Sequence, residues 1–221
     1  MGTIWQNAPA ISLESGCYDG LSPVSVLKHH GDLGIGAFDQ LDGEMTGVDG
    51  IFYRITGDAT AHVAADSETL AFCMVTPFLG TESYRLPSEM TEAGLTPYMD
   101  DKLGPRNYFY GLRLDGVFKN VRTRCFPKQT KPYPSLSEVM KTQPTFSYDR
   151  LEGTMVGFRA PSYVGHMTPP GDHLHLISAD RTFGGHVMSF EGAEATLRVE
   201  RIDRHEIDYP LTQEFATKKL D

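Results

Sequence analysis

The sequence predicts an α+β fold in which mixed and antiparallel sheets dominate and helices are few and short. Short runs of alternating apolar and polar residues recur along most of the chain, as is typical of strands with one buried face. Asp-Gly and Gly-Asp pairs separate many of these runs, and the 221 residues include 22 glycines and 14 prolines. The length suffices for one or two domains with a sizeable core.

The N-terminal third predicts one short helix and a meander. In residues 22–30, SPVSVLKHH, a proline stands at the first helical position, where its missing N–H costs nothing. Residues 34–64 alternate like strands and predict an antiparallel meander. Its three expected turns are Asp42-Gly43, Asp49-Gly50 and Gly57-Asp58.

The middle of the chain predicts the longest helix and a hairpin. Residues 86–104 favour a helix, although Gly94 and Pro97 weaken it. Residues 108–126, YFYGLRLDGVFKNVRTRCF, alternate on both sides of Asp115-Gly116, so we expect a hairpin with its turn at that pair.

A proline-rich connector, PKQTKPYP at residues 127–134, follows that hairpin. Ser135 and Glu138 have the spacing of a capping box and predict a short helix over residues 135–143. Residues 145–210 again alternate like strands. We therefore expect a soft boundary at residues 127–144, with a β-rich N-terminal subdomain of residues 1–143 and a C-terminal β subdomain of residues 144–221.

Charge and composition limit the class of partner. The formal net charge of −9 argues against nucleic acid, because phosphate binding needs clustered Lys and Arg. The longest apolar runs fall short of the roughly 18 residues of a membrane span, and the start of the chain lacks the pattern of a signal peptide. Cys17, Cys73 and Cys125 are far apart, which favours reduced thiols. We expect a cytoplasmic protein that acts on a small molecule.

Three histidines form the most informative pattern, within GDHLHLISADRTFGGHV at residues 171–187. His173 and His175 are two apart, which puts both on one face of a strand. A turn-rich stretch leads to His186, and an even hairpin would bring His186 to the same face. Three neutral imidazoles could then bind one cation and leave positions open for substrate.

An isolated HxH pair is common by chance, so the three-histidine spacing carries the prediction. Three histidines suit Zn²⁺, and Fe²⁺, Mn²⁺, Co²⁺ or Ni²⁺ would also fit. The sequence GDLGIGAF at residues 31–38 contains GxG, but it lacks the third glycine and the following helix of a dinucleotide site. We expect no organic cofactor.

Glu44, Arg122 and Arg124 are weaker candidates. Glu44 follows the Asp42-Gly43 turn directly, and on position alone an exposed hairpin glutamate is the preferred interpretation. Arg122 and Arg124 share one face of a strand. A solvated face is preferred for them, and the alternative is that one of them points inward as a fork for a substrate carboxylate.

Four segments together resemble the acetolactate decarboxylase family. They are residues 31–45, GDLGIGAFDQLDGEM; 107–143, from NYFYG to MKTQ; 152–164, EGTMVGFRAPSYV; and 171–187. Their order and spacing are similar to those of the family over residues 20 to 215. The resemblance implies two β-rich subdomains with the active site between them, and a homodimer.

The resemblance also implies residue roles. His173, His175 and His186 match the metal ligands, Glu44 matches a glutamate implicated in proton transfer, and Arg124 matches an arginine that faces the substrate. Arg122 has no matching role. Two departures stand out: Ala37 occupies a position where many relatives have Thr, and the C-terminal tail that in some relatives adds a glutamate ligand has no counterpart before Asp221.

The implied reaction converts 2-acetolactate to acetoin and CO₂ in acetoin or butanediol metabolism. Loss of CO₂ leaves an electron pair that becomes a metal-stabilised enediolate, since a Lewis acid already lies where the charge develops. Arg124 would orient the carboxylate, and Glu44 would direct the proton to carbon.

Two other functions stay open from the sequence alone. A non-enzymatic, DNA-associated relative shares the HxH and GGH pattern, and the acidic charge and the Glu44 and Arg124 segments count against it. A cupin-like metalloenzyme also uses three histidines and a glutamate. Its glutamate normally follows HxH closely, and no glutamate follows His175 closely here.

Overall fold

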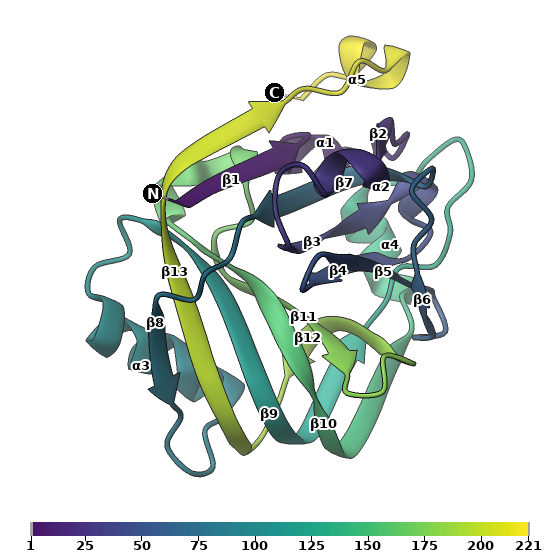
Figure 1. Cartoon of the computed structure of the whole chain (residues 1–221). Coiled ribbons are helices and arrows are strands. Elements are labelled where there is room, and N and C mark those ends of the chain that lie inside the picture. The colour runs from purple at the N-terminus through teal and green to yellow at the C-terminus, as the bar shows by residue number, and fades with distance from the viewer. Residues whose placement is uncertain (1, 221) are drawn as a thin grey trace.

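The computed structural model describes residues 2–220 and is mostly β, with a large mixed sheet and few short helices (Figure 1). The strands are β1 (Gly2–Asn7), β2 (Ser22–Pro23), β3 (Leu33–Phe38), β4 (Glu44–Val48), β5 (Ile51–Ile55), β6 (Ala61–Val63), β7 (Thr69–Thr76), β8 (Glu82–Arg85), β9 (Phe109–Arg124), β10 (Thr145–Ala160), β11 (Gly171–Ser178), β12 (Gly184–Ser189) and β13 (Ala193–Asp208). The helices are α1 (Ala10–Glu14), α2 (Val24–Leu27), α3 (Glu92–Leu103), α4 (Leu136–Thr142) and α5 (Gln213–Thr217), with 3-10 turns η1 (Asp39–Leu41) and η2 (Ser162–Met167).

The predicted meander is confirmed. β3, β4, β5 and β6 pair antiparallel in succession. The β4–β5 turn consists of Asp49 and Gly50, whose φ angles are 53° and 75°. Two successive positive φ values define the turn type that matches strand twist in a two-residue hairpin, which is why Asp-Gly stands there.

The lower half of Figure 1 is built from the long strands β9, β10 and β13. β10 pairs with both β9 and β11, and β12 pairs with both β11 and β9, so these four strands close on themselves. β13 pairs with β9 along its first half and runs parallel to β1 along its second. β1 pairs in turn with β7. β13 therefore joins the ring to the N-terminal meander in one sheet.

The expected hairpin at Asp115-Gly116 is wrong, because β9 runs straight through that pair. The Asp115 carboxylate accepts hydrogen bonds from Arg113 and Arg198 on the sheet surface. A Cβ atom at Gly116 would lie 2.4 Å from the Glu194 carbonyl oxygen of β13. The glycine permits close approach of two strands rather than a turn.

All three predicted helices are present. Pro23 is the N-cap of α2, one position before its expected place, and Ser135 and Glu138 form the predicted capping box of α4. α3 begins at Glu92 rather than near residue 86, because the Thr91 side chain accepts a hydrogen bond from the Gly94 N–H and caps the helix there.

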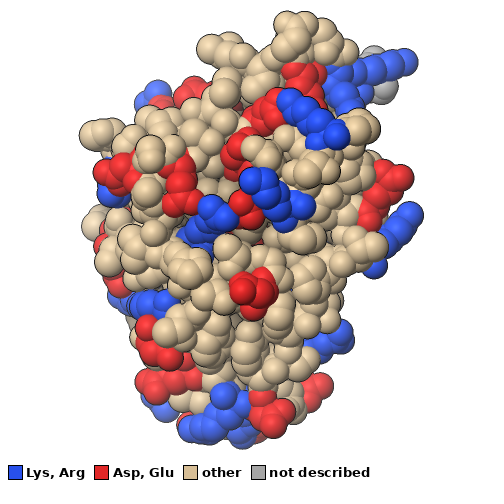
Figure 2. Space-filling model, turned by 90° about the vertical axis from the view of Figure 1, so that its right-hand side faces the viewer, with Lys and Arg blue, Asp and Glu red and all other residues tan. Residues whose placement is uncertain are grey.

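The connector at residues 127–134 leads from β9 through α4 to β10, and these two strands pair over most of their length. The division into subdomains at residues 127–144 stays a prediction. Within residues 2–220, no helix is both long and apolar enough to cross a membrane. Acidic and basic side chains are interspersed on the face in Figure 2.

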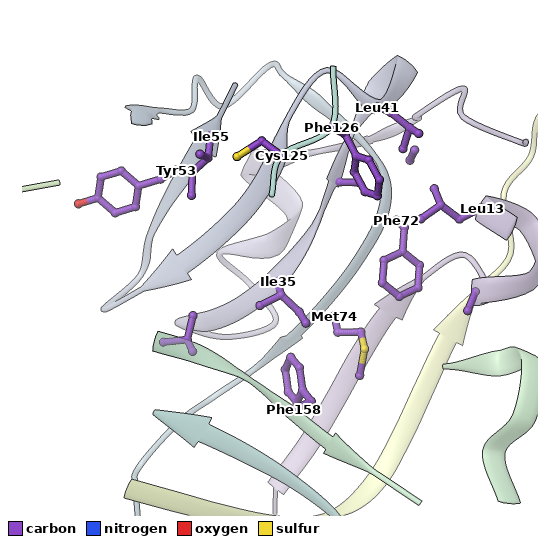
Figure 3. Close-up of a cluster of buried hydrophobic side chains, with 14 of the residues drawn as sticks. Leu13, Ile35, Leu41, Tyr53, Ile55, Phe72, Met74, Cys125, Phe126 and Phe158 are labelled. Carbon is purple, nitrogen blue, oxygen red and sulfur yellow. The ribbon is translucent and has the colours of Figure 1, made fainter. Parts of the chain in front are cut away.

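The largest core cluster lies between the meander and the β10–β11 strands. Its members include Ile35 and Phe72 from the meander side, Phe126 just after β9, and Phe158 from β10 (Figure 3). Several of these side chains also form the wall of the cavity described below. The core therefore supports the site directly.

Candidate metal centre

The three predicted histidines converge. His175 of β11 and His186 of β12 are directly opposite each other in the antiparallel register, so the predicted hairpin is confirmed. His173 lies two residues earlier on the same face of β11. Ligand atoms of the three rings all lie within 4.8 Å of one another, and His173 Nε2 is 3.0 Å from His186 Nδ1.

Glycines in the two neighbours of β11, namely β10 and β12, allow these strands to lie close to it. A Cβ atom at Gly157 of β10 would lie 1.8 Å from the His173 carbonyl oxygen. A Cβ atom at Gly184 of β12 would lie 2.2 Å from the Leu176 carbonyl oxygen. Real side chains do not fit at these distances, so these glycines set how closely β10 and β12 approach β11.

Burial keeps the three imidazoles neutral at neutral pH. It lowers the pKa of His173 to about 4, with the nearby Arg124 charge acting in the same direction. The pKa values of His175 and His186 fall well below 6.5 for the same chief reason. His175 Nδ1 donates to the Met45 carbonyl oxygen at 2.8 Å, because a carbonyl only accepts, so its Nε2 lone pair is free.

Glu44 is the first residue of β4 and is 3% exposed, so the preferred interpretation of an exposed hairpin residue is wrong. Its Oε2 lies 3.7 Å from His175 Nε2. Its Oε1 is buried and has no hydrogen-bond partner among residues 2–220. Burial raises the pKa of Glu44 to about 8, and the Arg124 charge opposes that rise.

Arg124 and Arg122 differ in their surroundings. Arg124 of β9 lies opposite His186 of β12 in the strand register, and its side chain lines the cavity. Its Nη1 donates a 3.3 Å hydrogen bond to Gln143 Oε1. Arg122 is exposed, near the end of β12 opposite Ser189. The preferred solvated face therefore holds for Arg122 and is wrong for Arg124.

These side chains surround one cavity of about 310 Å³. Its polar lining includes all five residues predicted from the sequence, namely Glu44, Arg124, His173, His175 and His186. Most of the remaining wall is apolar, formed by Ala10, Leu13, Ile35, Gly36, Ala37, Phe72, Phe126, Leu136, Pro169 and Pro170. Glu14 and Asp172 complete it. The cavity thus has a polar, charged end and a wall that suits small alkyl groups.

This apolar wall was not predicted from the sequence. Phe126 lies two residues after Arg124, so strand alternation would have placed both on one side. Ile35 and Ala37 likewise share a face of β3. Phe72 and Leu136 come from segments with no distinguishing pattern.

The donor set fits a divalent transition metal. Three neutral imidazole nitrogens within one small space match the ligands of catalytic Zn²⁺ sites, which keep open positions. The unpartnered Glu44 Oε1 supplies a carboxylate oxygen beside them, and a buried polar atom of this kind needs a partner.

Comparison with known proteins agrees with this geometry. The sequence profile of the family described as alpha-acetolactate decarboxylase matches residues 4–221. The alpha-acetolactate decarboxylase of Bacillus subtilis (strain 168) is 37% identical over 218 residues, which cover 99% of this chain and 86% of that protein. That of Methanosarcina mazei is 37% identical over 217 residues, covering 98% and 75% respectively.

Solved structures show the same similarity. The crystal structure of the Bacillus subtilis strain 168 enzyme superposes with a TM-score of 0.96 at 37% identity, covering 99% of this chain and 94% of that one. A Staphylococcus aureus protein of unknown function, 24% identical, shares the fold with a TM-score of 0.94 over 99% of this chain and 94% of its own. The chain belongs to the alpha-acetolactate decarboxylase family of carboxy-lyases.

Proposed function

We propose that this chain decarboxylates 2-acetolactate to acetoin and CO₂ with one Zn²⁺, or another divalent transition metal, held by His173, His175 and His186. One observation carries the proposal: the three histidines, Glu44 and Arg124 line a single cavity although they come from four different strands. The family membership supplies the reaction class.

His173, His175 and His186 would hold the metal, which when bound would supply Lewis-acid stabilisation of the negative charge that develops on the substrate as CO₂ leaves. The Arg124 guanidinium lies at the same end of the cavity and is the group that binds the carboxylate as a planar fork. It thereby fixes the direction in which the breaking C–C bond points.

Glu44 then directs the proton. Its carboxyl group lies against His175 inside the cavity, so the reacting carbon of a substrate beside the histidines comes within its reach. A group fixed on one side protonates one face of the carbon, which sets the handedness of acetoin. The apolar wall of Ile35, Phe72 and Phe126 contacts the methyl groups and excludes water.

The test measures CO₂ and acetoin release from racemic 2-acetolactate, with and without a chelator, together with metal content. We expect activity that chelation abolishes and added Zn²⁺, Co²⁺ or Mn²⁺ restores. His173→Ala and His186→Ala should lose both metal and activity. Chelator-resistant activity, or full metal occupancy in a variant with all three histidines changed to Ala, would refute the proposal.

The homodimer implied by the resemblance belongs to the same proposal, as does the role in acetoin metabolism. Sedimentation velocity of the purified chain measures the assembly. A mass near twice the 24.5 kDa of one chain is expected, and a monomer at all concentrations would remove the dimer from the proposal.

A further inference from the structure

An ion-pair network joins α3 to the strand that carries His173. Arg159 of β10 and Asp172 of β11 are direct cross-strand partners, with Arg159 Nε 3.5 Å from Asp172 Oδ1. Arg159 also pairs with the Asp100 carboxylate of α3. The Thr96 hydroxyl of α3 donates to Asp172. The network therefore ties α3 to β10 and β11 through a side chain that is 1% exposed.

This network borders the weakest-paired part of the metal site. The whole length of β11 pairs with β10, whereas β12 pairs with residues 175–177 of β11. His175 thus has a paired strand on each side, and His173 lies where the described pairing comes from β10 alone. Asp172 directly precedes His173 on β11, and both residues line the cavity. A shift of Asp172 would move the His173 backbone with it.

The Arg159 side chain is buried and is held by protein groups of α3. Arg159 Nη2 lies 3.4 Å from the Thr96 carbonyl oxygen, so the guanidinium contacts α3 through backbone as well as through side chain. Within residues 2–220, Arg159 Nη1 and Asp172 Oδ1 have no hydrogen-bond partner. Two buried ionic groups that are not fully satisfied add little stability for their cost, which favours a role in fixing geometry.

We propose that Arg159 is a positioning residue for the metal site: through Asp172 it anchors the N-terminal half of β11 to α3 and holds the His173 imidazole where a cation requires it. This inference rests on the proposed metal site. Residues that orient metal ligands from outside the ligand set change metal affinity by roughly 10- to 100-fold when they are removed. The predicted signature is therefore weaker metal binding by a folded protein.

The experiment titrates the metal-free chain with Co²⁺ and follows its visible absorption, alongside thermal unfolding of the metal-free form. Arg159→Met should weaken Co²⁺ binding by roughly 10- to 100-fold. Arg159→Lys, which keeps the charge, should recover part of the loss. If Arg159→Met fails to fold, Arg159→Gln, which removes the charge but keeps a polar side chain and leaves the cavity lining unchanged, should show the same weakened binding.

Arg113→Met is the matched control. Arg113 is also a largely buried arginine of the long strands, paired with Asp115 and Asp49 but outside the cavity lining. Its loss should lower the melting temperature and leave Co²⁺ affinity unchanged. Unchanged Co²⁺ affinity in the folded Arg159 variants, even with lower melting temperatures, would overturn the inference. A wild-type chain that does not bind Co²⁺ would instead overturn the proposed metal site, and this inference with it.

Discussion

Glu44 has one carboxylate oxygen 3.7 Å from a histidine nitrogen and the other without a partner among the described residues. We predict that Glu44→Gln slows acetoin formation by roughly two to four orders of magnitude, the range for loss of general acid–base help. The isosteric amide keeps the packing, and Arg124 and the histidines still bind substrate. The residual acetoin should be less enantiopure, because solvent then reaches either face. Steady-state kinetics with chiral analysis of the product measures both effects.

Metal content separates two roles for Glu44. Unchanged metal with a slow rate assigns proton transfer, and metal loss in parallel with rate assigns ligation. A Glu44→Gln protein with normal rate and normal stereochemistry would rule out both.

The two arginines of β9 provide an internal comparison. Arg124→Lys keeps the charge but loses the bidentate fork. Loss of one hydrogen bond to a charged group costs about 1.5–3 kcal/mol, so we expect activity to fall about 10- to 100-fold while metal content stays constant. Arg122→Lys should be nearly silent, because Arg122 is exposed. Comparison of kcat/KM for the two variants tests this difference. Equal losses would mean that both arginines support the structure of β9 and that Arg124 does not bind the substrate.

Residue patterns predicted the histidine cluster better than its surroundings. His173, His175 and His186 are local in sequence, so strand alternation and one hairpin were enough to bring them together. Glu44 and Arg124 reach the site from β4 and β9, and their burial depends on how distant strands pack. No local pattern around either residue records that packing, which is why a surface position was the preferred interpretation from the residues alone.

At the scale of single strands, close approach to β11 depends on glycine. We predict that Gly157→Ala destabilises the protein by about 1–3 kcal/mol or more and lowers metal affinity, since its Cβ would lie 1.8 Å from the His173 carbonyl oxygen. Chemical denaturation and Co²⁺ titration measure the two effects. Gly94→Ala is the control, because Gly94 lies in α3, where the new methyl group meets the Met90 and Thr91 side chains at 3.2 and 3.3 Å.

The control should leave metal affinity unchanged, because Gly94 lies outside the cavity lining and its new methyl group meets only the Met90 and Thr91 side chains at the start of α3. Equal metal affinity in Gly157→Ala and wild type would show that β10 does not set the position of His173.

The strands themselves were predictable, and one turn was not. Asp49-Gly50 and Asp115-Gly116 look alike in sequence, yet the first is a two-residue turn and the second lies inside a strand. The difference lies in the tertiary contacts. Gly116 lies against the β13 backbone, and the Asp115 carboxylate accepts hydrogen bonds from two arginines. The same dipeptide therefore allows a turn with positive φ angles at residues 49–50 and close packing of two strands at residues 115–116.

At the scale of the whole molecule, the sequence predicted a β-rich fold but not its connections. The parallel pair of β1 and β13 joins residues about 200 positions apart, and the closed ring of β9 to β12 depends on two strands of 16 residues that each pair on both sides. Alternation specifies which face of a strand is buried but not which strand lies beside it. These long-range pairings bring the site together.

Because the three histidines come from a hairpin inside that closed ring, a metal bound to them should stabilise the entire fold. A ligand that binds only the native state adds RT ln(1 + [L]/Kd), about 4 kcal/mol when it is present at 1,000 times its Kd. For a chain of this size, each kcal/mol corresponds to roughly 2–4 °C. We therefore predict that chelation lowers the melting temperature by about 8–16 °C and that added Zn²⁺ restores it, as measured by scanning calorimetry. His173→Ala should melt at the same temperature with and without chelator, because it has already lost the site. If neither chelator nor added metal changes the wild-type melting temperature, the three histidines bind no ion in the native state.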